Sequence, residues 1–383
     1  MTFLIDIRLL TTGRVSGVEE YTRNLMSALI RRAPNDRFEL LYNGFRKAPL
    51  PSEWLNAPNV RVIDRRIPNK LFDLAARTIG FPRANMFTRD ATLAFTPHLN
   101  PLRVSAPMKR IVTFHDISFI HFPEFFPLRK RLWLWLQDYR REARRADALV
   151  VDCAFTRQDI VETLHVPAER IHVITPGIDP RYRPFVPGEF DGNAFRRMRG
   201  IRSPFLLFSG VLEPRKNIEG VIRAFTRLKR DGKRPGLALV IVGDRGWLYD
   251  RIFNEARRST AFADIVFWGH AAPEDLRALY TLAEAFVYPS FFEGFGFPPL
   301  EAQSCGAPVI VSNRSTLPEV IGASGILVDP WDTDALAAAL ESVLDDRSLR
   351  DELIRRGYRN VTRFSWDTAA DSLLALFRSI THP

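Results

Sequence analysis

The chain has few of the features that would place it outside the cell or inside a membrane. It contains only two cysteines, Cys153 and Cys305, whose separation fits neither a disulfide framework nor a zinc-binding spacing. No apolar run approaches the ~18 residues that a membrane-spanning helix needs. The first apolar stretch carries Asp6 and Arg8, so we expect a strand there and not a signal peptide. These absences predict a cytoplasmic protein in a reducing compartment.

Negative charge is scarce in the first half of the chain. Residues 1–200 contain 32 Lys and Arg against 21 Asp and Glu, a net charge of +11, whereas residues 201–383 have a net charge of −1. A one-sided basic field attracts an anionic partner, which could be a phosphorylated acceptor, a membrane leaflet or nucleic acid. The chain carries no zinc finger, helix-turn-helix or RNA-binding signature, so we expect no nucleic-acid partner.

Short apolar runs alternate with helical patterns along most of the chain. This alternation predicts an α/β fold with parallel sheets, and 383 residues suffice for about two or three domains. Between residues 176 and 204 the pattern gives way to prolines, glycines and arginines, which indicates an interdomain linker. The expected strands are residues 3–8, 38–43, 60–63, 93–96, 110–114, 149–152, 205–209, 239–243, 265–268 and 285–288.

The most informative segment is residues 288–313, which combines a strand end, a glycine-rich turn, a helix start and a further strand. Glu293 and Glu301 lie eight positions apart, with Gly294 and Gly296 between them and a Pro-Pro pair placed to open a helix. A helix N-terminus favours anions, and carboxylates bind the hydroxyls of a polyol. The segment therefore predicts a site for a sugar nucleotide.

The residues F-F-E-G-F-G-F-P-P-L-E-A, followed by C-G-A-P-V-I-V-S, resemble the donor-site signature of family 4 glycosyltransferases. This group is retaining and has the two-domain GT-B architecture. The resemblance implies that Glu293 and the backbone of residues 294–297 hold the donor sugar, and that Glu301 holds the ribose. The alternative is a tight turn in which Phe292, Phe295 and Phe297 only pack against the core.

A second constellation is the E-P-R-K-N segment at residues 213–217. Arg215 and Lys216 are expected on a strand-to-helix loop, where a diphosphate would meet amides and two cations. The segment resembles the family's phosphate-binding loop, which implies that the cations stabilise the departing nucleoside diphosphate in place of a metal. A solvated surface pair is the alternative. Further donor-binding candidates here and in the next loop are Gly210, Asn217 and Gly243.

Two segments of the first half also resemble the family. Residues 11–18 resemble its first glycine loop, where the backbone at Gly17 meets the diphosphate, although an ordinary turn would look similar. T-F-H-D-I-S-F resembles the "HD" position of bacterial mannosyl- and rhamnosyltransferases. His115 and Asp116 are thus catalytic candidates at a strand end, with His115 beside the donor sugar; for both, a structural role is the alternative. Trp247 could stack on a base or cap the core.

A long basic helix with tryptophans is expected over residues 128–146. Such a helix suits an anionic membrane interface. Alternatively, its apolar residues face the core and its cations are simply solvated. The basic residues are Arg129, Lys130, Arg131, Arg140, Arg141, Arg144 and Arg145.

The motifs follow the family's order along nearly the whole chain. The resemblance implies two Rossmann-like, doubly wound domains with a cleft between them. We expect the acceptor-side domain at residues 1–185 and the donor-binding domain at residues 186–364. A C-terminal helix, residues 365–383, would cross back to the first domain.

The implied reaction moves a hexose, mannose or a deoxymannose, from a nucleotide diphosphate sugar to an oligosaccharide or lipid-linked acceptor. The resemblance favours a GDP-linked donor and implies retention with no cofactor. It also implies that no metal is needed, and no Asp-x-Asp loop is placed to hold one. The enzyme could lie on the inner face of the plasma membrane. The alternatives are a UDP-sugar-dependent enzyme of the same fold and a non-catalytic protein that binds sugar nucleotides.

Overall fold

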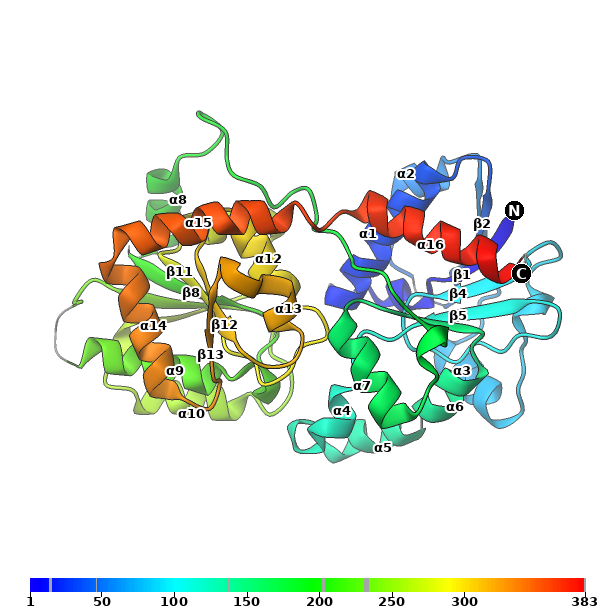
Figure 1. Cartoon of the computed structure of the whole chain (residues 1–383), viewed down its shortest axis with the longest axis horizontal. Helices are drawn as coiled ribbons and strands as arrows, with labels where there is room; N and C mark the ends of the chain where they lie inside the picture. Colours follow the sequence, from blue (N-terminus) through cyan, green and yellow to red (C-terminus); the bar gives the residue numbers. More distant parts are fainter. Residues whose placement is uncertain (14–15, 46, 137, 202–203, 231–233, 382–383) are drawn as a thin grey trace. The chain divides into compact units, whose positions relative to one another are not determined.

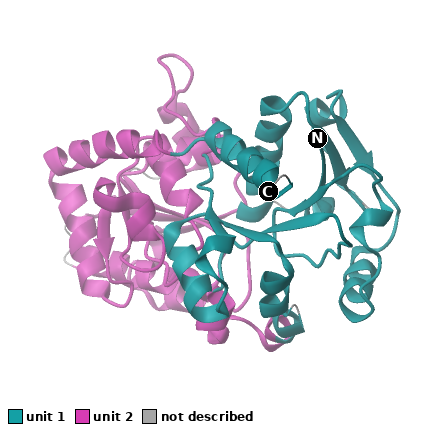
Figure 2. Ribbon diagram, turned by 45° about the vertical axis from the view of Figure 1, so that its right-hand side comes forward, with its two compact units in different colours: residues 1–117, 132–177, 364–383 teal, residues 118–131, 178–363 magenta. Residues whose placement is uncertain are grey.

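The computed structural model describes residues 1–13, 16–45, 47–136, 138–201, 204–230 and 234–381. These residues form two compact units, coloured separately in Figure 2. Unit 1 comprises residues 1–117, 132–177 and 364–383, and unit 2 comprises residues 118–131 and 178–363. The sequence prediction drew its boundaries at residues 185 and 365 and did not assign residues 118–131 to the second domain.

Unit 1 is built on a seven-stranded parallel sheet in the order β3-β2-β1-β4-β5-β6-β7. Ile5 on β1 lies between Leu40 on β2 and Phe95 on β4. Most strands of this sheet are buried apolar runs, as expected when helices cover both faces of a sheet. The strands are β1 (Thr2–Asp6), β2 (Arg37–Leu41), β3 (Val60–Ile63), β4 (Leu93–Thr96), β5 (Lys109–Thr113), β6 (Ala148–Val151) and β7 (Ile171–Val173).

Unit 2 repeats this design with a six-stranded parallel sheet in the order β10-β9-β8-β11-β12-β13. In both units the first strand lies inside the sheet, so the chain winds first to one side and then to the other. The prediction of two doubly wound α/β sheets is confirmed. The strands are β8 (Phe205–Ser209), β9 (Ala238–Val242), β10 (Ile265–Gly269), β11 (Ala285–Tyr288), β12 (Val309–Ser312) and β13 (Ile326–Val328).

The prediction of one helix over residues 128–146 is wrong, because the structure has two. Asp138 takes a left-handed conformation (φ 47°) and caps the second helix by accepting a bond from the Arg141 amide. Gln137 lies outside the described residues. The helices and helical turns between residues 1 and 177 are η1 (Arg8–Thr12), α1 (Gly17–Arg32), α2 (Ser52–Leu55), α3 (Asn69–Thr78), η2 (Ala84–Met86), α4 (Ser118–His121), η3 (Pro123–Phe125), α5 (Leu128–Leu136), α6 (Tyr139–Arg145), α7 (Ala154–Leu164) and η4 (Ala168–Arg170).

The segment predicted as a linker is not free of regular structure, because α8 forms within it. Arg277 of α11 also binds Glu189 and the carbonyl oxygens of Arg183 and Pro184, which ties this segment to unit 2. The later helices and turns are α8 (Gly192–Arg199), η5 (Pro214–Lys216), α9 (Ile218–Lys229), α10 (Asp250–Arg258), η6 (Phe262–Asp264), α11 (Pro273–Leu282), α12 (Phe297–Ser304), α13 (Leu317–Ile321), η7 (Gly322–Ser324), α14 (Thr333–Asp345), α15 (Arg347–Val361) and α16 (Trp366–Thr381).

The C-terminal helix returns to unit 1, as predicted. The chain passes from α15 in unit 2 to α16, which packs beside α1 (Figure 1). Phe377 on α16 is fully buried, with its ring centroid 4.9 Å from that of Phe3 and 5.4 Å from that of Phe95. Within the described residues, no helix is both long enough and apolar enough to cross a bilayer.

We predict that Phe377→Ala destabilises the protein by about 3–5 kcal/mol, because it removes an aromatic ring from the core of unit 1. Urea unfolding monitored by circular dichroism measures this. Ser372→Ala, at an exposed position of the same helix, is the matched control and should be nearly neutral. Equal effects of the two substitutions would contradict a structural role for α16 in unit 1.

Candidate functional site

The strand order of each sheet reverses at one point, and the candidate residues gather there. In unit 2 the reversal lies between β8 and β11, and in unit 1 between β1 and β4. In open parallel sheets, ligands bind beyond the carboxyl ends of the strands at such a point. The loops that follow β8 and β11 carry Arg215, Lys216 and Glu293, so these three residues lie where a ligand of unit 2 would be expected.

Glu293 is the centre of an ion cluster at this point. Its carboxylate accepts hydrogen bonds from Lys216 Nζ at 2.7 and 2.9 Å and from Arg215 at 3.0 Å. Arg215 also donates to Glu213 at 2.7 Å and to the carbonyl oxygen of Phe292 at 2.6 Å, while Lys216 donates to the hydroxyl of Tyr288. The two cations and the carboxylate, predicted from separate motifs, are therefore brought into direct contact.

Burial and charge act in opposite directions on this cluster. Burial alone would raise the pKa of Glu293, which is only 5% exposed, but Arg215 and Lys216 lower it to about 2. Burial lowers the pKa of the Lys216 ammonium, and Glu293 opposes that change. The carboxylate is thus ionised at neutral pH between two cations, an arrangement that can exchange partners with an entering anion or with sugar hydroxyls.

The predicted glycines allow a close approach of backbone segments. Gly210 and Gly243 both have φ 147°, and a Cβ on Gly243 would lie 1.9 Å from the carbonyl oxygen of Gly210. Gly296, with φ 100°, is the residue before α12, and Pro298 and Pro299 occupy the first turn. Only glycine suits these positive φ values, and α12 consequently begins with its amides facing the loop that carries Glu293.

Two predicted donor-binding residues, Glu301 and Asn217, have different kinds of hydrogen-bond partner. Glu301 accepts a hydrogen bond from the Tyr280 hydroxyl at 3.0 Å, and that hydroxyl also contacts Ser209 at 2.7 Å. Asn217 is 2% exposed, and its side-chain amide donates to the carbonyl oxygens of Pro289 and Pro330. Asn217 therefore joins two loops, which is a structural use that the sequence did not indicate.

Phe295 and Phe297 also pack against each other, with their ring centroids 5.1 Å apart. Gly294 is the residue between Glu293 and this pair. Residues 294–297 thus form a compact turn. Such a turn is expected both for a donor-sugar site and for a turn whose aromatic residues only pack against the core.

In unit 1, His115 follows β5 and both of its ring nitrogens are engaged. Nδ1 lies 2.7 Å from Asp152 Oδ2, and Nε2 lies 3.0 Å from the carbonyl oxygen of Pro97. Burial lowers the pKa of His115, but Asp152 and the Pro97 carbonyl outweigh it and the net change is upward. Burial raises the pKa of Asp152 more than His115 lowers it. Any contact between His115 and a sugar would have to replace the Pro97 carbonyl.

The other candidates of unit 1 are Asp116 and Gly17. Asp116 is the residue after His115, and Gly17 is the first residue of α1. The middle of the predicted glycine loop, Arg14 and Val15, lies outside the described residues. Sequence reasoning missed Asp152, although its position at the end of the predicted strand 149–152 was a usable signal.

Trp247 packs against the segment of residues 118–131, which joins unit 2. Its Nε1 donates to the carbonyl oxygen of Phe125 at 2.5 Å, its ring stacks on Phe126, and Lys130 Nζ lies 3.3 Å from the ring centroid. Phe125 also stacks on Phe291 at 5.5 Å. This segment, which begins two residues after Asp116, therefore contacts the loop that carries Glu293.

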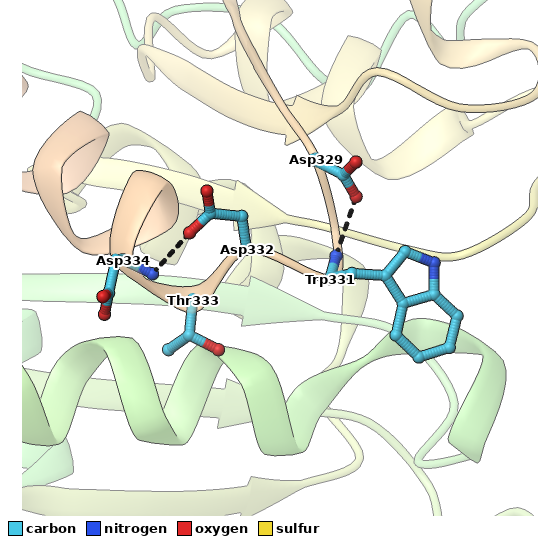
Figure 3. A pocket seen from close by; sticks show the side chains of 5 residues that line it. All are labelled: Asp329, Trp331, Asp332, Thr333 and Asp334. Carbon is cyan, nitrogen blue, oxygen red and sulfur yellow. Dashed lines mark hydrogen bonds between the residues drawn. The ribbon is translucent and has the colours of Figure 1, made fainter.

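A shallow hollow of about 460 Å³ lies at the start of α14 (Figure 3). Its lining residues are Asp329, Trp331, Asp332, Thr333 and Asp334. The carboxylates of Asp329 and Asp332 accept backbone bonds within this turn, so they shape the loop and cap the helix. In the described part of the chain, no group of His, Cys, Asp and Glu is placed to hold a metal ion.

Two doubly wound units, with a cation–carboxylate cluster at the strand reversal of the second, define a protein of the GT-B class. Comparison with known families agrees: residues 15–182 match the model for glycosyltransferase family 4, and residues 194–360 match the model for glycosyl transferases group 1.

The chain is 34% identical over 270 residues to O-antigen chain mannosyltransferase B of Escherichia coli, covering 70% of each protein. It is 25% identical to the serotype-specific mannosyltransferase WbdA of the same organism, and the match covers 97% of this chain but 47% of WbdA, so the chain spans about half of that relative. The structure of HepE from Anabaena with UDP-glucose superposes with a TM-score of 0.73 at 18% identity, covering 99% of this chain and all of HepE, which supports the fold alone.

The chain belongs to glycosyltransferase family 4. It is a hexosyltransferase with the GT-B fold, and the family, fold and enzyme class predicted from the sequence are confirmed.

The His115–Asp152 pair predicts a pH dependence of stability. Because the folded pKa of His115 lies above its ordinary value of 6.5, its stabilising contribution is complete below pH 6.5 and is lost as the pH rises through the folded pKa. The free energy of unfolding of wild type minus that of His115→Gln should therefore shrink as the pH rises. Urea titrations at several pH values measure it, and a constant difference would contradict the pairing.

Proposed function

We propose that the protein transfers mannose or a deoxymannose, with retention, from a GDP-linked donor to an oligosaccharide or lipid-linked acceptor in surface polysaccharide synthesis, and that it needs no metal. The single observation that carries this proposal is the Arg215–Lys216–Glu293 cluster at the strand reversal of unit 2. The similarity to two mannosyltransferases supports mannose, and one of them, O-antigen chain mannosyltransferase B, supports the acceptor class.

In the proposed mechanism, the cluster exchanges its internal partners for the donor. The diphosphate takes the place of Glu293 on Arg215 and Lys216, and the released carboxylate accepts hydrogen bonds from the sugar hydroxyls. Charge develops on the diphosphate as the glycosidic bond breaks, and two fixed cations stabilise this leaving group most strongly in the transition state. The amides at the start of α12 add a dipole of the same sign.

Further residues are proposed to contact other parts of the donor. Glu301 is proposed to bind the ribose, and Gly17, Gly210 and Gly243 to let the backbone approach the donor. His115 is proposed as a contact of the donor sugar. Its partner Asp152 keeps the ring oriented, because a short bond to a buried carboxylate fixes one nitrogen.

A UDP-linked donor is the second candidate, and one observation favours it: the similarly folded HepE binds UDP-glucose. A protein that binds sugar nucleotides without turning them over is a third. Intact charged groups in the cluster do not by themselves separate these possibilities.

A panel of GDP-, UDP-, ADP- and dTDP-sugars, tested without metal, decides between the three. We expect GDP-mannose to raise the unfolding temperature most, because a ligand that binds the folded state stabilises it. We also expect the protein to release GDP slowly from this donor. Mannosides with an octyl chain, added as acceptor probes, should accelerate release. Stabilisation by UDP-sugars alone would assign the second candidate, and binding without release would assign the third.

Lys216→Ala should lower kcat by about 100-fold or more while the fold survives, because the leaving group loses one of its two cations. The matched control is Lys229→Ala. Lys229 is also a largely buried lysine in an ion pair, 3.0 Å from Asp264, but it does not belong to the cluster. Its loss should reduce stability and leave kcat unchanged. An unchanged rate in Lys216→Ala would remove Lys216 from the site.

We further propose an anionic membrane leaflet, on the cytoplasmic side, as a partner of unit 1. On α3, Phe72 and Ala76 face the core, which leaves Leu71 and Leu74 exposed. Arg77 of α3 lies 5.7 Å from the ring of Trp133 on α5, so the two helices adjoin (both labelled in Figure 1). We call the exposed apolar side chains of these two helices and of residues 79–86 the apolar face: Leu71, Leu74, Ile79, Phe81, Met86, Leu132, Trp133, Trp135 and Leu136.

Cations accompany this apolar face, which favours an anionic lipid surface over a neutral protein partner. Lipid headgroups attract exposed arginine and lysine side chains, while indole rings insert at the interface. Exposed cations lie on α3, on the segment after it and on α6, the helix that follows α5: Lys70, Arg83, Arg140, Arg141, Arg144 and Arg145.

Trp135→Ser should weaken binding to phosphatidylglycerol vesicles by about tenfold, close to 1.4 kcal/mol, because an exposed indole no longer inserts. Trp331→Ser is the control, since Trp331 is 67% exposed and Trp135 is 75% exposed, but Trp331 belongs to unit 2. Co-sedimentation measures both, and high salt should weaken binding. Equal binding to neutral phosphatidylcholine vesicles would contradict the proposal.

A further inference from the structure

One buried side chain at the strand reversal of unit 1 has no use in the site described so far. His98 follows β4, beside β1 at the point where the strand order changes direction. It is 7% exposed, and neither ring nitrogen has a hydrogen-bond partner among the described residues. Both the position and the missing partners set His98 apart from His115, whose two nitrogens are engaged.

Leaving a buried imidazole without partners costs stability. A buried polar atom that lacks a hydrogen bond destabilises the folded state, and most buried polar atoms in folded proteins are paired. Phenylalanine would fill a similar space in a core position without this cost. A polar ring at a strand reversal, where ligands of parallel sheets bind, is better explained by a ligand than by packing.

The surroundings keep the His98 ring neutral. Burial lowers its pKa to about 4, and the nearby Arg8 and His115 act in the same direction, while Asp6 opposes them. The Asp6 carboxylate is already bound to Arg8 at 2.7 and 2.9 Å, so it does not hold the imidazole. A neutral imidazole offers one N–H donor and one lone pair. It can therefore both donate to and accept from a hydroxyl group.

The two units can be compared at their equivalent points. In unit 2 the strand reversal carries two cations and a carboxylate, which suit a diphosphate and sugar hydroxyls. In unit 1 the cation Arg8, which lies two residues after β1, is paired with Asp6 and with Asp73 at 2.9 Å. His98 adds a neutral hydrogen-bonding ring at this edge, which suits an uncharged hydroxyl group and not a phosphate.

We propose that His98 binds a hydroxyl group of the saccharide acceptor at the strand reversal of unit 1. This inference rests on the proposed glycosyl transfer and adds the residue that positions the acceptor.

The test compares His98→Phe, His98→Gln and wild type. The probes are the donor and the octyl mannoside that most stimulate nucleotide release by wild type. We expect His98→Phe to lower kcat/KM for the mannoside by about tenfold or more, as for a lost hydroxyl contact. The donor-induced rise in unfolding temperature and the release of nucleotide without acceptor should not change. His98→Gln, which can still donate and accept, should recover part of the loss.

Stability gives a readout that needs no substrate. If His98 is a ligand-facing residue, His98→Phe should unfold at or above the wild-type temperature, because unpaired polar atoms leave the core. His172→Phe, on the edge strand β7, is the control and should not alter acceptor kinetics.

A lower unfolding temperature in both His98 variants, an unchanged kcat/KM for the mannoside, or an equal loss of donor binding would overturn the inference. If wild type neither binds nor releases any donor, the proposed function itself fails. The unfolding temperature of His98→Phe still tests whether the ring has a structural role.

Discussion

The buried charge of Glu293 constrains the structure of the candidate site in unit 2. A carboxylate that is 5% exposed stays ionised only if cations replace its hydration, and Arg215 and Lys216 do so. Removing one partner of such a buried pair commonly costs about 3–5 kcal/mol. The loop after β8 and the loop after β11 are therefore held together, although they are about 77 positions apart in the chain.

This constraint extends to neighbouring groups. Tyr288 lies under Lys216, Asn217 ties the adjacent loop to the carbonyls of Pro289 and Pro330, and Gly243 must be glycine because Gly210 approaches it so closely. The charged groups are thus preorganised before a ligand arrives, which is the condition for electrostatic stabilisation of a leaving group. The same ionic contacts that stabilise unit 2 are those that a donor would displace.

Unit 1 has the same strand pattern but uses its charges differently. Asp6 and Arg8 follow β1 and form a buried pair that Asp73 completes, with the Arg8 guanidinium 3.9 Å from the centroid of the Phe72 ring. These three charges are therefore committed to the core, whereas His98 and the His115–Asp152 pair lie at the strand ends. One architecture thus carries two cations around a buried carboxylate at the strand reversal of unit 2 and imidazole rings at the strand ends of unit 1.

The sequence by itself determined the fold class and named the residues of the candidate site. Strand-length apolar runs and local motifs depend on residues close in the chain, which is why β3, β4, β8 and β11 were predicted with both ends correct and why Arg215, Lys216 and Glu293, which contact one another in the structure, were named as candidates. Only the tertiary structure decided what depends on distant contacts. It showed that residues 118–131 join unit 2 through Trp247, that Asn217 joins two loops, and that His98 is buried without a hydrogen-bond partner among the described residues. A hydrogen bond between segments far apart in the sequence produces no periodic pattern along the chain. Sequence patterns therefore predict neither the presence of such a bond nor its absence.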